Sequence, residues 1–404
     1  MSDPRSQSTK TGPAPADVGI RPPLLLTLAL LAALAPFATD LYLPGFPAIA
    51  VALDTDASGV QLTLTTFLVG LAFGQLVTGP LSDRLGRRGP LIVSAAVCVL
   101  AGVATALTPN LAVLVVARLI QGFTGAGGMV IGRAVIADLV TGRAAAKAFT
   151  LMLTVGGVAP VVAPLVGGLL AGPVGWRGML WAVVVLCVLM LAAVLAFVPE
   201  TRPPSAAHAM PFREAFQKVL AARGYWGHTA VFALGFAVMM AYISSSPFVY
   251  QNVLGLNEVQ YGVAFGINAA GLIATGAVVS RLVDRVSPNR IVTAALALQI
   301  SAVGLLVLLV VLGAPVWTYA VAIFCVVLSN GGILGTSAAL AMAHVREVAG
   351  TGSAVMGFSQ FALGAVVSPL VGLGGEDSAL VPALVMALSS LLAMTASLLT
   401  RRTY

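Results

Sequence analysis

The chain has 404 residues, of which 59% are hydrophobic and only 9% are charged, and its mean hydropathy is +1.01. Charged residues make up roughly a quarter of a typical soluble domain, so this composition excludes an ordinary soluble fold and predicts an all-α integral membrane protein. The net charge of +7 would also suit a nucleic-acid-binding protein, but the positions of the basic residues indicate membrane topology instead. We therefore expect a lipid bilayer as a partner, and no nucleic acid.

Twelve apolar segments follow a polar stretch, residues 1–23, which is rich in Pro, Ser and Thr and which we expect to be a disordered cytoplasmic tail. Each segment is long enough to cross a hydrocarbon core of about 30 Å as a helix. The expected spans are 24–44, 61–81, 90–108, 111–137, 148–171, 178–198, 227–250, 260–281, 291–312, 316–343, 352–374 and 379–400. The long connection at 199–226 is interpreted as a cytoplasmic linker between two six-helix bundles, 24–198 and 227–400.

The orientation follows from the basic residues. If the N-terminus is cytoplasmic, nearly all of the 21 lysines and arginines fall in cytoplasmic segments, the exceptions being Arg118, Arg133 and Arg177. This asymmetry is what the positive-inside rule requires of twelve spans with both ends on the cytoplasmic side. The sequence thus predicts a multi-pass protein of the inner (plasma) membrane with both termini in the cytoplasm.

Asp40 is a single acid in the most apolar part of the chain. An ionisable residue inside a membrane span is costly, and is by default a hypothesis for a functional site. At a helical rise of about 1.5 Å per residue, Asp40 and Arg118 of the fourth span lie at similar depths. We interpret Asp40 as a proton carrier whose charge is controlled by burial and by Arg118. The alternative is a static ion pair that holds the first and fourth spans together.

The two halves carry a similar charged turn after their second spans. Leu-Ser-Asp-Arg at 81–84 follows the second span, and Leu-Val-Asp-Arg at 282–285 follows the eighth. Two six-span halves that share a turn at the same place indicate parallel repeats related by an axis along the membrane normal. Secondary transporters have this organisation, with the substrate site between the halves near the middle of the membrane.

Several motifs together carry a family resemblance. Residues 79–88, Gly-Pro-Leu-Ser-Asp-Arg-Leu-Gly-Arg-Arg, resemble the signature turn between the second and third spans of the major facilitator superfamily. Further motifs resemble the bicyclomycin/chloramphenicol-resistance (Bcr/CflA) branch of its twelve-span drug:proton antiporters, and they lie at 40–44, 118–122, 159–168, 242–249 and 349–354. Ala163-Pro164 departs from the Gly-Pro that is common in the branch. The resemblance implies twelve helices in two pseudo-symmetric six-helix bundles, and no enzyme activity.

The charged turn and its neighbourhood form the first candidate site, which comprises Gly79, Asp83, Arg84, Gly86, Arg87, Arg88 and Asp138. Asp138, at the end of the fourth span, is the expected partner of Arg84 or Arg87. The resemblance implies that this turn latches the outward-facing state. The alternative is that the arginines only fix the topology.

The fifth span is the second candidate site, because glycine and proline recur along it. Internal prolines kink a helix and free a backbone carbonyl. The candidate residues of this span are Gly156, Pro160, Pro164, Gly167 and Gly168. The resemblance implies that such an antiporter helix seals the contact between the halves and helps to set the direction of exchange, whereas ordinary tight packing is the alternative.

The third candidate site is a substrate cavity that mixes aromatic surface with a few polar groups, as suits amphipathic ligands of drug size. Its candidate residues are Tyr42, Gln121, Tyr242, Ser244, Ser245 and Phe248. With the resemblance, these observations predict a monomeric proton-coupled exporter of chloramphenicol-like or bicyclomycin-like drugs that works by alternating access. A proton symporter or facilitator for a small metabolite is the alternative.

Other classes of function lack support in the sequence. The chain has no His-Glu-x-x-His or Gly-x-Ser-x-Gly motif for a membrane enzyme, and no Gly-x-x-x-x-Gly-Lys-Ser/Thr phosphate-binding loop. We therefore expect no cofactor and a proton gradient as the energy source. The three cysteines lie in apolar spans and are interpreted as small hydrophobic residues, so we expect no metal site.

Overall fold

The computed structural model describes residues 20–140, 142–201 and 212–402, and every regular element within these ranges is a helix. Residues 1–19 of the predicted tail and 202–211 of the predicted linker lie outside the described residues. The N-half comprises α1 Pro22–Asp40, α2 Phe46–Ala52, α3 Ala57–Leu85, α4 Arg88–Leu107, α5 Leu111–Leu139 and α6 Gly142–Phe197. In the predicted linker, α7 spans Phe212–Ala221. The C-half comprises α8 Arg223–Phe248, α9 Glu258–Leu282, α10 Pro288–Val311, α11 Trp317–Ala343, α12 Ala349–Gly372 and α13 Leu380–Arg402.

Eleven of the described helices are long and apolar enough to cross a membrane. One of them, α6, has 56 residues, which would make a straight helix of about 84 Å. Gly175 interrupts it with a φ of 63° and a ψ of −175°, a conformation that glycine adopts without steric cost. With α6 divided there, the twelve predicted crossings are confirmed.

Polar caps fix the beginnings of three helices at the same end of the molecule. The Asp56 carboxylate accepts a hydrogen bond from the backbone N–H of Gly59 at 2.8 Å, and the Asn110 side chain accepts one from Ala112 at 2.8 Å. Asn257 begins α9 with a reciprocal capping box. Such caps satisfy backbone N–H groups that have no partner inside the helix.

The first helix of each half ends in an irregular turn. After α1, a short 3₁₀ turn, Leu43–Gly45, leads into α2, and after α8 comes a π turn, Val249–Val253. Pro44 has no N–H to donate, so it cannot continue α1. The predicted span 24–44 is therefore wrong at its end, because the apolar crossing continues through α2 to Ala52.

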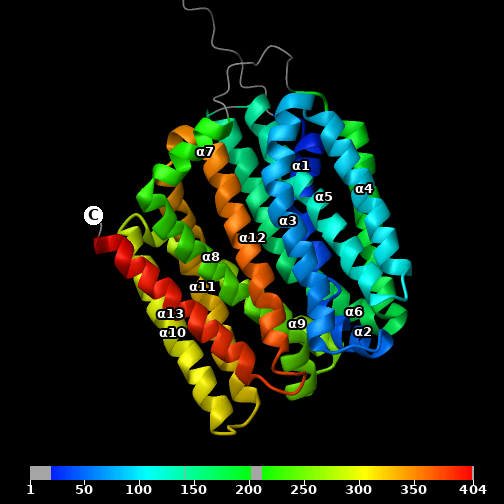
Figure 1. Cartoon of the computed structure of the whole chain (residues 1–404), viewed down its shortest axis with the longest axis vertical. Coiled ribbons are helices and arrows are strands. Elements are labelled where there is room, and N and C mark those ends of the chain that lie inside the picture. The colour runs from blue at the N-terminus through cyan, green and yellow to red at the C-terminus, as the bar shows by residue number, and fades with distance from the viewer. Residues whose placement is uncertain (1–19, 141, 202–211, 403–404) are drawn as a thin grey trace, which may run out of the picture.

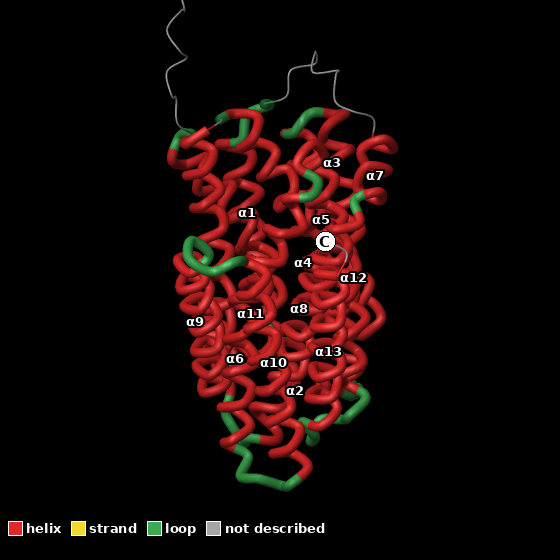
Figure 2. The backbone as a smooth tube through the Cα atoms, turned by 90° about the vertical axis from the view of Figure 1, so that its left-hand side faces the viewer, coloured by secondary structure: helices red, strands yellow, loops and turns green. Residues whose placement is uncertain are grey.

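The helices run lengthwise, with loops at both ends (Figure 2). We call the end that carries α7 and the turn between α3 and α4 the linker side, and the end that carries α2 the distal side (Figure 1). The N-half and the C-half lie next to each other, and α12 packs beside α3 across their boundary.

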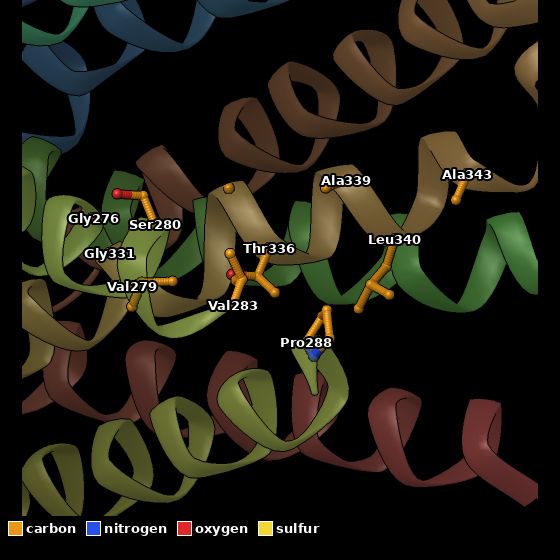
Figure 3. Close-up of a pocket in the computed structure, with 11 residues that line it drawn as sticks. Gly276, Val279, Ser280, Val283, Pro288, Gly331, Thr336, Ala339, Leu340 and Ala343 are labelled. Carbon is orange, nitrogen blue, oxygen red and sulfur yellow. The ribbon is translucent and has the colours of Figure 1, made fainter. Parts of the chain in front are cut away.

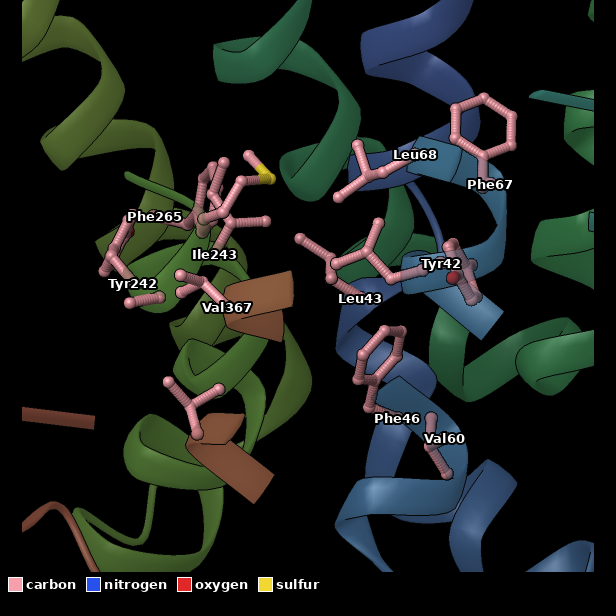
Figure 4. Close-up of a cluster of buried hydrophobic side chains, with 14 of the residues drawn as sticks. Tyr42, Leu43, Phe46, Val60, Phe67, Leu68, Tyr242, Ile243, Phe265 and Val367 are labelled. Atoms are coloured by element: carbon pink, nitrogen blue, oxygen red, sulfur yellow. The ribbon is translucent and has the colours of Figure 1, made fainter. Parts of the chain in front are cut away.

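The apolar cores show which side is closed. One continuous core, which occupies the middle and distal parts, combines N-half residues such as Leu43 and Phe46 with C-half residues such as Ile243 and Val367. These side chains approach one another from the two halves in Figure 4. On the linker side, by contrast, the cores are separate and belong to one half each. The structure is therefore closed on the distal side.

Candidate functional site

Asp40 is the last residue of α1 and lies where the helix breaks. Only 3% of its surface is exposed, and one carboxylate oxygen accepts a hydrogen bond from the hydroxyl of Thr39 at 2.8 Å. It forms no ion pair with a lysine or arginine in the part of the chain that the structure describes. An acid this buried, with one hydrogen bond and no cation, is an unusual feature for a purely structural role.

Arg118 lies fully buried in the N-half, close to the end of α1. Its guanidinium donates to the carbonyl of Ala38 at 2.9 Å and to the side-chain oxygen of Gln121 at 2.7 Å. The guanidinium carbon lies 4.5 Å from the ring centre of Tyr42 and 4.4 Å from that of Phe67. The static ion pair with Asp40, which was the alternative interpretation of the sequence, is therefore not formed.

The free carbonyl groups at the end of α1 explain why Arg118 does not pair with Asp40. The last carbonyls of α1 have no intrahelical partner, and they carry the negative end of the helix dipole. Arg118 therefore binds the Ala38 carbonyl, two residues before Asp40. It positions the helix end that bears Asp40 instead of contacting the carboxylate.

The part of α6 before Gly175, which is the second candidate site, packs against α1 in the N-half and against α9 in the C-half. A methyl group at Gly167 would overlap the carbonyl oxygen of Leu41, next to Asp40, and one at Gly168 would press on the carbonyl of Glu258 in α9. Pro164 is buried, and its carbonyl faces Gly262 of α9. This part of the candidate stripe therefore holds α1 and α9 against one face of α6.

The linker-side part of the same stripe differs. A methyl group at Gly156 would meet no atom within 4 Å, and Pro160 is only half-buried. Close packing between the halves thus involves Pro164 and Gly168, and Gly167 packs against the end of α1 within the N-half, whereas Gly156 takes part in neither contact. The regular spacing of glycine and proline along this span could not distinguish the packed positions from the open one. Sequence spacing does not show where along α6 the two halves separate.

The candidate cavity residues occupy three kinds of place. Tyr42 bonds to Thr63 inside the N-half at 3.0 Å, and Gln121 is bound by Arg118. The hydroxyls of Ser244 and Ser245 bond to carbonyls of their own helix. The other two side chains, those of Tyr242 and Phe248, lie at the boundary between the halves. The ring of Phe248 lies 6.2 Å from that of Phe46 in the N-half.

Two amide side chains that the motifs did not indicate connect the halves directly. Gln61 of α3 donates to the backbone carbonyl of Ser244 at 3.0 Å, and Gln251 of the π turn donates to the carbonyl of Pro44 at 3.0 Å. A third amide, Asn268 of α9, donates to the hydroxyl of Tyr242 at 2.9 Å. A search for uncharged amides within the apolar spans would have found Asn268 and Gln61.

The charged turn between α3 and α4 is held together by Arg87. Its guanidinium donates to Asp83 at 2.7 Å and to Asp138 at 2.8 Å, so the expected partnership with Asp138 is formed by Arg87. Burial lowers the pKa of Arg87, but hydrogen bonds and charge attraction from Asp138 and then Asp83 outweigh this effect and raise it. Arg84 takes part in none of the ion pairs among the described residues.

Glu200, at the end of α6, completes this turn. Its carboxylate accepts hydrogen bonds from the backbone N–H groups of Arg87 and Arg88, at 2.7 and 3.0 Å. Gly86 has a φ of +88°, which the tight turn requires. At Gly79, by contrast, an added methyl group would make only an ordinary contact with Val130. The partners of the turn named here lie on α3, on α5 and just after the end of α6, and none of these belongs to the C-half.

Two further features lie apart from the candidate residues. A groove of about 500 Å³ separates the linker-side ends of α9 and α11 and reaches the start of α10 (Figure 3). Its lining includes Gly276, Gly331 and Thr336 but none of the predicted site residues. The sulfur atoms of Cys98 and Cys187 lie 3.8 Å apart in the N-half core, although the two residues are distant in the sequence.

Comparison with known proteins decides the family. The model of the Major Facilitator Superfamily matches residues 28–369 of this chain. The chain belongs to the Major Facilitator Superfamily. This superfamily member is 34% identical over 357 residues to an uncharacterised MFS-type transporter of Bacillus subtilis, YdgK, a match that covers 87% of this chain and 88% of the relative.

Other relatives of this superfamily member carry names from drug resistance. A bicyclomycin resistance protein homolog of Haemophilus influenzae is 29% identical, with 88% of this chain and 90% of the relative covered. A chloramphenicol resistance protein of Pseudomonas aeruginosa is 28% identical, with 84% and 80% covered. The resemblance to the bicyclomycin/chloramphenicol-resistance branch is thus confirmed.

Solved structures show the same fold. A D-xylose-proton symporter has a TM-score of 0.76 at 15% identity, covering 94% of this chain and 96% of the other. A bacterial homolog of the human lysosomal transporter Spinster, in an inward-facing and unoccupied conformation, has a TM-score of 0.74 at 16% identity, covering 96% and 98%. The predicted fold class is confirmed, and the family and structural neighbours of this superfamily member are transporters, not enzymes.

Proposed function

We propose that this transporter exports small amphipathic drugs of the chloramphenicol or bicyclomycin type in exchange for protons, by alternating access across the inner (plasma) membrane. The names of the relatives from Haemophilus influenzae and Pseudomonas aeruginosa support the substrate class. The proposed transporter works as a monomer and needs no cofactor, since the proton gradient supplies the energy.

The orientation in this proposal rests on the basic residues. Arg84, Arg87 and Arg88 surround the turn on the linker side, and α7 adds Lys218 there. The positive-inside rule then assigns the linker side, with both termini, to the cytoplasm. The distal-closed structure corresponds in this proposal to the inward-facing state.

The burial of Asp40 without a cationic partner is the observation that supports proton coupling. An ionised carboxylate that is buried without a cation is unstable in a low-dielectric interior, so a proton is the ligand that would compensate its charge when the distal side closes. When the distal side opens, water can solvate the carboxylate and a proton can bind from the outside. For exchange, this proton leaves toward the linker side in the distal-closed state, so that protons move inward as drug moves outward. Proton binding at Asp40 is thereby tied to the movement of the halves.

Transport by the purified protein in liposomes tests this function. With radiolabelled chloramphenicol equal on both sides, an imposed pH difference should drive the drug toward the acidic compartment, and a protonophore should abolish the accumulation. The Asp40→Asn protein should show no response to the gradient.

The alternatives give different results in the same assay. Movement of the solute in the same direction as the protons would indicate a symporter, and movement that is indifferent to the pH difference would indicate a facilitator. Either result would contradict the proposed exchange.

A further inference from the structure

A cluster of three phenols and one amide lies buried in the C-half, at the boundary with the N-half. It consists of Tyr242 of α8, Tyr250 of the π turn, and Tyr261 and Asn268 of α9, none of which is more than 3% exposed. The amide nitrogen of Asn268 donates to the hydroxyls of both Tyr242 and Tyr250 at 2.9 Å. We call these four residues the phenol–amide cluster.

The direction of these hydrogen bonds leaves two donors unused. Because Asn268 donates to both phenol oxygens, Tyr242 and Tyr250 each retain their own hydroxyl hydrogen to donate. No hydrogen bond among the described residues supplies an acceptor for either of them. A buried donor without an acceptor is costly, so a group that accepts from it binds favourably.

Tyr261 differs from its two neighbours. Its hydroxyl lies 3.0 Å from that of Ser246, and Ser246 gives its own hydrogen to the carbonyl of Ile243. Tyr261 is therefore the donor in this pair, and its hydrogen is already used. The unused donors of the cluster are those of Tyr242 and Tyr250.

The cluster lies across the boundary from Asp40. Gly167 and Gly168, adjacent residues of α6, contact the Leu41 carbonyl beside Asp40 and the Glu258 carbonyl one turn before Tyr261. In agreement with this arrangement, Asp40 is close enough to Tyr242 and Tyr261 for an electrostatic interaction with their phenol groups. Figure 4 shows Tyr242 and Ile243 on the C-half side of this boundary and Leu43 on the other.

We propose that the unused donors of Tyr242 and Tyr250 form a binding site for uncharged compounds that carry acceptor oxygens, such as carbonyl or nitro groups. Asn268 positions the two phenols for this role. This inference rests on the proposed export function and names the chemistry that its substrates must share.

Equilibrium binding to the purified full-length protein in detergent tests the site. Two radiolabelled probes are compared: chloramphenicol, which carries amide and nitro oxygens, and tetraphenylphosphonium, an apolar cation without a hydrogen-bond acceptor. Tyr242→Phe and Tyr250→Phe each remove one donor and keep the ring. Tyr319→Phe is the matched control, because Tyr319 is also buried but its hydroxyl makes no hydrogen bond among those described.

Each of the two cluster variants should weaken chloramphenicol binding about threefold to tenfold, the loss expected for one hydrogen bond. Both should leave tetraphenylphosphonium binding unchanged, and Tyr319→Phe should change neither. If one cluster variant does not fold, the other still decides the question.

Unchanged chloramphenicol binding in the cluster variants, or equal weakening for both probes, would overturn the proposed site. So would a wild-type protein that binds only tetraphenylphosphonium. The binding assay has no proton gradient, so its outcome does not depend on proton coupling. If transport does not respond to a pH gradient, the proposed binding site is not contradicted. If the cluster variants bind chloramphenicol normally, the proposed proton exchange is not contradicted.

Discussion

Replacing Gly167 by alanine should weaken the attachment of α6 to the end of α1. The added methyl group would overlap the carbonyl oxygen of Leu41, which is backbone and cannot rotate away. The matched control is Gly156→Ala on the same helix, where the methyl group would meet no atom within 4 Å. Both substitutions remove a glycine from a helix, so both gain about 0.8 to 1.0 kcal/mol of helix propensity.

The shared gain cancels when the two variants are compared. The difference between them is the cost of overpacking, which is about 1 to 3 kcal/mol for an extra carbon in a tightly packed site. Gly167→Ala should therefore be less stable than Gly156→Ala by about 1 to 3 kcal/mol. Reversible unfolding in mixed micelles, followed by tryptophan fluorescence, measures this difference.

The transport assay adds a second readout. Because Leu41 is next to Asp40, Gly167→Ala should also slow drug movement driven by a pH gradient, whereas Gly156→Ala should not. Equal stability and equal transport in the two variants would refute the reasoning that close contact at Gly167 holds the Asp40 region.

Three further comparisons follow from the site. Asp40→Asn should abolish the response of transport to a pH gradient while the protein still inserts and folds; unchanged drug resistance in cells that express it would contradict the coupling role. Arg118→Ala should reduce transport and stability more than Arg177→Ala. Arg118 loses fully buried charged hydrogen bonds of about 1.5 to 3 kcal/mol each, whereas the hydrogen bonds of Arg177 to the carbonyls of Ala106 and Thr108 are only part-buried. Arg87→Ala should lower the free energy of unfolding by about 1 to 3 kcal/mol through loss of its two carboxylate partners, and Arg84→Ala should leave it unchanged; equal effects would argue that the turn acts through net charge alone.

The sequence predicted the parts of the structure that depend on local composition. Apolar runs long enough to cross a membrane placed the helices to within a few residues. The prediction that Asp138 pairs with Arg84 or Arg87 was confirmed, because Arg87 is its partner. The end of the first span was wrong, because an apolar run continues through Pro44 and hydropathy alone does not detect a break in backbone hydrogen bonding.

The contacts between helices were less predictable. Similar depth suggested that Arg118 would pair with Asp40, but depth does not specify the direction in which a side chain points, and the free carbonyl of Ala38 is the better placed acceptor. The phenol–amide cluster was missed except for Tyr242, because its residues come from three segments and only Tyr242 belongs to a motif.

The hydrogen bond from Gln251 to the carbonyl of Pro44 joins two turns that already depart from α-helical geometry. Releasing it therefore unwinds no regular helix, and water can take over both polar groups at a net cost of about 1 kcal/mol. This one contact therefore adds little to the free energy that is needed to separate the halves on the distal side.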